Sequence, residues 1–108
     1  MRRRAIAVLA ALQCALAGSA QADAIDGTWC HRDGRHFVIL GPKIVTPGGA
    51  AIEGRYGRHD FSYVVPGREP DAGRTVLMLL VNEQTVHWRL DASTGAPEIW
   101  KRCTVTTS

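Results

Sequence analysis

The chain has 108 residues, of which 45% are hydrophobic and 21% are charged, and its formal net charge is +3. This length suits one small domain, and no apolar run reaches the roughly 20 residues that a membrane-spanning helix needs. The basic excess comes from Arg2, Arg3 and Arg4, while all ten acidic residues lie further along the chain. The charge therefore gives no reason to expect nucleic acid or an anionic membrane as a partner.

The first 22 residues have the pattern of a secretory signal peptide. The three arginines precede an apolar run from Ala5 to Ala17, and Ala-Gln-Ala at 20–22 is typical of a signal-peptidase site. We expect cleavage near Ala22, which leaves residues 23–108 as one periplasmic or secreted domain with no stable membrane anchor. Ten lysines and arginines then balance ten acidic residues, so this domain carries no formal net charge.

Cleavage would remove Cys14 and leave two cysteines, Cys30 and Cys103. An even number of cysteines in an oxidising compartment predicts a disulfide, and the absence of a Cys-x-x-Cys pair argues against a redox role. The bridge would join the first and last predicted strands. Closing so long a loop stabilises a small domain by roughly 4 kcal/mol in the chain-entropy model.

After residue 22 the sequence has the pattern of antiparallel β-structure. Short runs rich in Val, Ile, Thr and aromatic residues alternate with Gly, Pro, Asn and Asp, and no segment shows sustained helical periodicity. The eight predicted strands are 27–32, 35–40, 43–46, 51–56, 59–65, 75–81, 85–90 and 98–103. We therefore expect an all-β fold, a small eight-stranded antiparallel up-and-down barrel or barrel-like sheet, which leaves no strand edge unpaired.

The turn signal Asp33-Gly34 suits a two-residue type I′ hairpin, which would place His31 directly opposite His36. Their Cβ atoms would then lie about 4.5–5.5 Å apart and present two imidazoles to Cu²⁺ or Zn²⁺. No third ligand is evident in the sequence. A periplasmic metal-binding protein that uses these two histidines is therefore our alternative function, and an exposed histidine pair without a role is the other interpretation.

The second turn signal, Gly57-Arg58, suits a type II′ hairpin with glycine first. It would place Tyr56 opposite His59 and gather the aromatic side chains of both strands on one face. Arg55 and Asp60 would then form an exposed ion pair on the other face.

Gly27-Thr28-Trp29 at the start of the first strand, together with Arg102 in the last, resembles the Gly-x-Trp opening of lipocalin-type (calycin) barrels. The resemblance implies a barrel topology in which Arg102 lies over Trp29. It covers these residues alone, and the family's helix and middle motif are missing, so it implies no particular ligand.

Side chains along the last strand alternate between its two faces, so Trp100 and Arg102 lie on one face and Lys101 and Cys103 lie on the other. An inward Cys103 would bury Lys101, which is unfavourable for an unpaired charge. We therefore expect the tryptophans, Trp29 and Trp88 among them, to lie inside the barrel and the cysteines outside. At eight strands the interior is filled by side chains or holds one small ligand.

In an up-and-down barrel, successive turns alternate between the two ends. If Gly41-Pro42 is a true turn, the Asp33-Gly34 turn, the turn at 47–49 and the loops 66–73 and 91–97 share one end. Longer loops gathered on a rigid scaffold are where binding usually occurs. The candidate binding residues that this loop end would carry are His31, His36, Arg68, Glu69, Asp71 and Asp91.

No arrangement of residues in the sequence predicts a reaction. There is no Gly-x-Ser-x-Gly, no phosphate-binding glycine loop, and no serine with a plausible histidine and acid at hand. The arginines are scattered, so they form no stripe that would bind nucleic acid. We expect a monomeric, non-enzymatic interaction domain without a cofactor, which binds an unknown protein or small ligand through the loop end.

Overall fold

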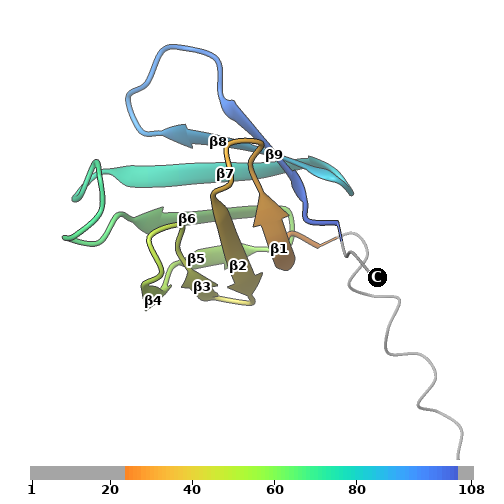
Figure 1. Cartoon of the computed structure of the whole chain (residues 1–108), viewed down its shortest axis with the longest axis horizontal. Helices are drawn as coiled ribbons and strands as arrows, with labels where there is room; N and C mark the ends of the chain where they lie inside the picture. Colours follow the sequence, from red (N-terminus) through yellow and green to blue (C-terminus); the bar gives the residue numbers. More distant parts are fainter. Residues whose placement is uncertain (1–23, 105–108) are drawn as a thin grey trace, which may run out of the picture.

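Alternating buried and exposed side chains build residues 24–104, the part that the computed structural model describes, into antiparallel strands (Figure 1). The predicted signal peptide lies outside these residues. The strands are β1 (Gly27–Cys30), β2 (His36–Leu40), β3 (Lys43–Val45), β4 (Ala51–Glu53), β5 (Arg55–Gly57), β6 (Asp60–Val64), β7 (Thr75–Asn82), β8 (Thr85–Leu90) and β9 (Glu98–Arg102). This confirms the predicted all-β fold, with nine strands in place of eight.

The nine strands form one nearly closed sheet in the order β4-β3-β2-β1-β9-β8-β7-β6-β5. Its two edge strands, β4 and β5, follow one another in the chain and are separated only by Gly54. The predicted strand 51–56 is therefore real but divided. Its first half pairs with β3 and its second half with β6, which brings the two edges of the sheet together.

Gly54 explains why this strand divides. Its N–H donates a hydrogen bond to the Pro42 carbonyl at 2.8 Å, so it still follows the β3 side. A Cβ at this position would collide with the Ser62 carbonyl oxygen and the Phe61 ring of β6. Only glycine allows the chain to approach both neighbours and change partner at one residue.

The interior is a single cluster of apolar side chains. Trp29 and Trp100 are fully buried at its centre, and Trp88 packs against it while remaining partly exposed. The predicted disulfide is present between Cys30 and Cys103, with the two Cα atoms 5.0 Å apart. Since β1 also pairs with β9, the bridge and the strand pairing join the two ends of the domain at the same place.

Arg102 and residues 24–26 close the end of the barrel opposite the longer loops. The guanidinium lies 4.3 Å from the centre of the Trp29 ring, as predicted, and donates to the carbonyls of Ala24 and Asp26 at 2.8 and 2.7 Å. Ile25 is fully buried between them, and its carbonyl accepts the Trp29 indole N–H at 2.8 Å. Burial lowers the pKa of Arg102. This end of the barrel is filled.

The predicted register of the first hairpin is wrong by one residue. Trp29 pairs with Phe37 and Cys30 pairs with His36, and the turn is a three-residue loop from Arg32 to Gly34. Gly34 has a φ of 101°, as a three-residue hairpin with a glycine bulge requires. This register puts two large aromatic side chains on the buried face, which outweighs the local preference for a two-residue turn.

The second hairpin turns one residue later than predicted, through Arg58 and His59. Gly57 pairs with Asp60 and Tyr56 with Phe61, so each residue keeps its predicted face but meets a different partner. Arg55 lies opposite Ser62, and the predicted Arg55–Asp60 cross-strand pairing is therefore wrong. Neither turn residue has a positive φ, so the loop is not the type II′ turn that a leading glycine would favour.

Candidate functional site

The longer loops gather at one end of the barrel and are tied to one another by side chains. Arg35 in the first loop donates to Glu98 beyond the last loop at 3.1 Å. The Thr46 hydroxyl donates to Glu69, and Arg74 donates to the Asp91 carbonyl at 2.6 Å. Because β2 and β3 are paired strands, Gly41-Pro42 is a true turn, and the predicted alternation of ends holds.

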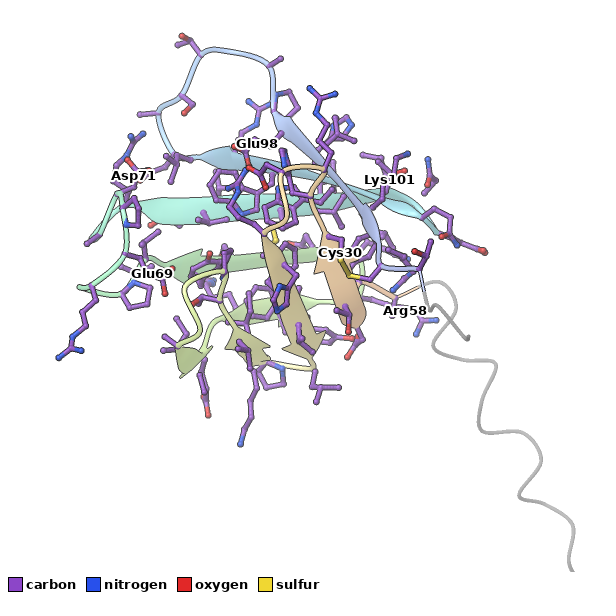
Figure 2. The ribbon with its side chains drawn as sticks, viewed as in Figure 1. Cys30, Arg58, Glu69, Asp71, Glu98 and Lys101 are labelled. Carbon is purple, nitrogen blue, oxygen red and sulfur yellow. A yellow bond between two sulfur atoms is a disulfide. The ribbon has the colours of Figure 1, made fainter. Side chains whose placement is uncertain are left out.

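A cavity of about 190 Å³ opens among these loops. Its walls combine apolar side chains with three charged ones, and the loop between β6 and β7 contributes Glu69 and Asp71 (Figure 2). The lining residues are Arg35, Pro47, Gly48, Tyr63, Val65, Glu69, Pro70, Asp71, Trp88 and Leu90. The loop end therefore carries a hollow between its loops, whereas Ile25 and Arg102 close the mouth of the barrel at the opposite end.

The turn between β3 and β4 fixes the position of Glu69. Thr46 is buried, and its hydroxyl donates to the Glu69 carboxylate while accepting the Ala50 N–H at 3.0 Å. A Cβ on Gly48 would occupy the space of the Glu69 carboxyl group. A small residue at 48 and a hydroxyl at 46 thus hold a carboxylate at the cavity wall.

Arg35 is held rigidly on the opposite loop. Its Nε lies 2.8 Å from Asp33 Oδ2, its Nη2 lies 3.1 Å from Glu98 Oε1, and its guanidinium lies 4.9 Å from the centre of the Trp100 ring. The Trp100 indole N–H also donates to Glu98 at 3.2 Å. Two carboxylates and an aromatic face therefore orient the guanidinium before any ligand arrives.

Tyr63 and Trp88 bring polar atoms into the apolar wall of the cavity. Burial, with a smaller contribution from the Glu69 carboxylate, raises the pKa of Tyr63 to about 12, although Trp88 and Arg35 act in the opposite direction. The Trp88 indole N–H is close enough to the Tyr63 hydroxyl to lower the pKa of that phenol as a donor, yet it is buried and forms no hydrogen bond of normal geometry. Buried N–H groups nearly always have an acceptor, so this one needs an explanation.

Of the predicted binding residues, Glu69 and Asp71 line the cavity. Arg68 is exposed on the same loop but does not line it. Asp91 does not line the cavity either, and its carboxylate is 3.6 Å from Arg74 Nε. Two of the four loop residues therefore face the hollow, and their role in binding stays a prediction.

The histidine pair is not formed. His31 packs its ring against Trp100, with the ring centres 5.1 Å apart, and accepts the Asp33 N–H. His36 is exposed and pairs with Cys30, on the outer face of the sheet. Since the one-residue change of register places the two imidazoles on opposite faces, the direct opposition on which the predicted Cu²⁺ or Zn²⁺ site depended is wrong.

Sequence reasoning missed three polar residues of the cavity: Arg35, Tyr63 and Trp88. Alternation along the strands placed both aromatic side chains on the inner face, but only the pairing of β6, β7 and β8 shows how they are related: Tyr63 pairs with Val76, and Trp88 pairs with Met78, two residues further along β7. Arg35 was predicted to begin the strand 35–40. The three-residue loop of the first hairpin directs the Arg35 side chain toward Glu98 and the cavity instead.

Within residues 24–104, no group of three or more His, Cys, Asp and Glu side chains is arranged to hold a metal ion. The same part of the chain has no helix that is long and apolar enough to cross a membrane. No family model, curated protein or solved structure matches the chain significantly. The chemistry of the site must therefore be inferred from its own residues.

Proposed function

We propose that this protein is exported and that its mature domain, residues 23–108, is a non-catalytic binding protein that holds a small ligand at the loop end. The observation that carries the proposal is the cavity of about 190 Å³ among the loops, in a barrel whose other end is filled by Arg102 and residues 24–26. Ligand sites are hollows with apolar walls and a few convergent polar groups, and this cavity has that composition.

The disulfide supports the export part of the proposal. Bonds of this kind persist outside the reducing cytoplasm, and Cys30–Cys103 joins the two ends of the domain. The signal pattern at 1–22 and cleavage near Ala22 remain a prediction. Mass spectrometry of the exported protein should show a chain that begins at Asp23 and is two hydrogens lighter than its reduced form.

The three tryptophans provide the binding assay. Trp29 donates its indole N–H to Ile25 at the filled end, Trp100 donates to Glu98, and that of Trp88 has no partner. Their indole signals in a ¹H–¹⁵N spectrum therefore report on three different parts of the barrel. We expect a screen of polar molecules of six to ten non-hydrogen atoms to yield compounds that shift the Trp88 signal and leave the Trp29 signal unchanged.

A matched pair of leucine variants makes the screen decisive. Leu90 lines the cavity, whereas Leu79 is about half exposed on the outer face of β7. Leu90→Phe should fill the hollow and abolish binding, and Leu79→Phe should leave it intact. The proposal would be overturned if both variants bound equally well, or if no compound in the screen shifted the Trp88 signal. The protein would then bind a protein partner through the surface of its loops alone.

A further inference from the structure

The cavity also indicates the chemical class of its ligand, an inference that rests on the proposed function. We infer that the ligand is a small zwitterion, an α-amino acid with an aliphatic side chain, whose carboxylate meets Tyr63, Trp88 and Arg35 and whose ammonium group meets Glu69 and Asp71. Size, hydrogen-bonding groups and charge distribution support this class independently of one another.

Size restricts the ligand first. An apolar cavity of about 150 Å³ accepts benzene, which has six non-hydrogen atoms. The loop-end cavity, at about 190 Å³, therefore suits a molecule somewhat larger than benzene and smaller than a nucleoside or a sugar chain. Valine, with eight non-hydrogen atoms, has the appropriate size.

The wall formed by the strands offers hydrogen-bond donors. The buried Trp88 N–H has no acceptor, and an indole nitrogen can only donate. The Tyr63 hydroxyl keeps its proton throughout the physiological range because its pKa is raised to about 12. The rigid Arg35 guanidinium lines the same cavity. A carboxylate can accept from all three, since each of its oxygens accepts two hydrogen bonds.

The wall formed by the loops offers acceptors and negative charge. The Glu69 carboxylate accepts a hydrogen bond from the Thr46 hydroxyl, a neutral group that leaves its charge uncompensated. Asp71 is 3.9 Å from Arg74 Nη1, at the limit of an ion pair. An ammonium group would donate to both carboxylates, whereas a ligand that carries only a carboxylate would be repelled by them.

The two kinds of group line one cavity. The charges of Glu69 and Arg35 both act on the Tyr63 hydroxyl, in opposite directions. An α-amino acid carries both charges in one small molecule and can meet both kinds of group. Val65 and Leu90 provide an apolar surface for its side chain.

Three probes of nearly one shape test the inference: L-valine, isobutylamine, which lacks the carboxylate, and isovalerate, which lacks the amine. Calorimetry and the Trp88 indole signal should show valine binding at least about tenfold more tightly than either single-charge probe, because each removes a set of charged hydrogen bonds. Isobutylamine or isovalerate binding as tightly as valine would overturn the inference.

Gly48→Ala tests the role of the Glu69 carboxylate by moving it without changing any charge. The new Cβ must displace the Glu69 carboxyl group, a movement that a flexible side chain permits without unfolding the turn. Valine affinity should fall about tenfold, and isovalerate affinity should stay the same or rise. Gly67→Ala is the matched control, since a Cβ at that position meets no atom within 4 Å and valine affinity should not change.

The results also separate this inference from the proposed function. A compound that lacks one of the two charges, shifts the Trp88 signal in a manner that depends on Leu90 and binds as tightly as valine would keep the binding site and refute the zwitterion. If no compound binds in a manner that depends on Leu90, both are wrong. Valine binding that is unaffected by Gly48→Ala and by Glu69→Gln would refute the assigned ammonium site.

Discussion

Tyr63 is the residue at which the buried interior of the barrel meets the polar cavity. The side chain is 4% exposed and belongs to the core, yet the charges of the Glu69 carboxylate and the Arg35 guanidinium both act on its hydroxyl. A phenol in this position stays neutral and can both donate and accept a hydrogen bond. The folded state therefore favours the protonated phenol, and loss of this proton lowers the free energy of unfolding.

Stability should consequently fall in alkaline solution. The unfolded chain releases the tyrosine proton near pH 10, whereas Tyr63 in the folded protein keeps it until about pH 12. Between these values the unfolded state binds fewer protons, so the contribution of Tyr63 is complete below pH 10 and declines as pH rises toward 12. The expected loss is about 2 kcal/mol, measured by urea unfolding at a series of pH values.

Tyr63→Phe should remove most of this alkaline decline. Tyr56→Phe is the control: its hydrogen bond to Asp26 raises the pKa of Tyr56 as well, but the side chain is 40% exposed, so solvent weakens the effect. An equal decline in the protein and in Tyr63→Phe would show that the Tyr63 phenol titrates normally.

At the scale of elements, the strand that divides at Gly54 decides how the sheet closes. β4 and β5 are each three residues long and pair on one side only, with β3 and β6. Edges this short are poor templates for pairing with another chain. Closure depends on the close approach of the Gly54 backbone to the Ser62 carbonyl oxygen.

Gly54→Ala should therefore destabilise the domain. The Cβ would collide with backbone and with a ring in the core, neither of which moves as easily as a flexible side chain. We expect a loss of about 1–3 kcal/mol in the free energy of unfolding, measured by denaturant titration. Gly67→Ala, in open space on a loop, should change it by less than about 0.5 kcal/mol. Similar values for the two variants would mean that the sheet closes without a close approach at residue 54.

At the scale of the whole molecule, the disulfide joins the first strand to the chain just after the last. Cys30 and Cys103 are 73 positions apart, so the bridge closes nearly the whole described chain into one loop. β1 and β9 are also paired, and the bridge therefore restricts the unfolded chain more than it changes the folded one.

Cys103→Ser should lower the stability of the domain by about 2–4 kcal/mol, since a long loop is no longer closed in the unfolded state. For a domain of this size the melting temperature should fall by more than about 10 °C in thermal unfolding. Reducing the unaltered protein should give the same decrease, and reducing Cys103→Ser should give none. A melting temperature that is insensitive to reduction would show that strand pairing alone holds the two ends.

Much of the architecture followed from the sequence by itself. Alternation of apolar residues predicted the strands, the inward tryptophans and the outward cysteines, and the turn signals predicted which end carries the longer loops. These features follow from the two-residue repeat of a strand and from the cost of burying Lys101, both of which are local properties. Glu69 and Asp71, which line the cavity, were predicted to lie at the loop end as polar residues of a long loop.

Only the tertiary structure decided the registers, the division at Gly54 and the cavity. Both hairpin turns differ from their local preferences. In the first hairpin the reason is that the burial of Trp29 against Phe37 and the contacts of Arg35 depend on residues from other strands. The one-residue difference separated His31 from His36 and turned Arg35 toward the hollow. A turn preference contributes about 1 kcal/mol, less than the burial of one large aromatic side chain, so packing between distant residues determined where the site lies.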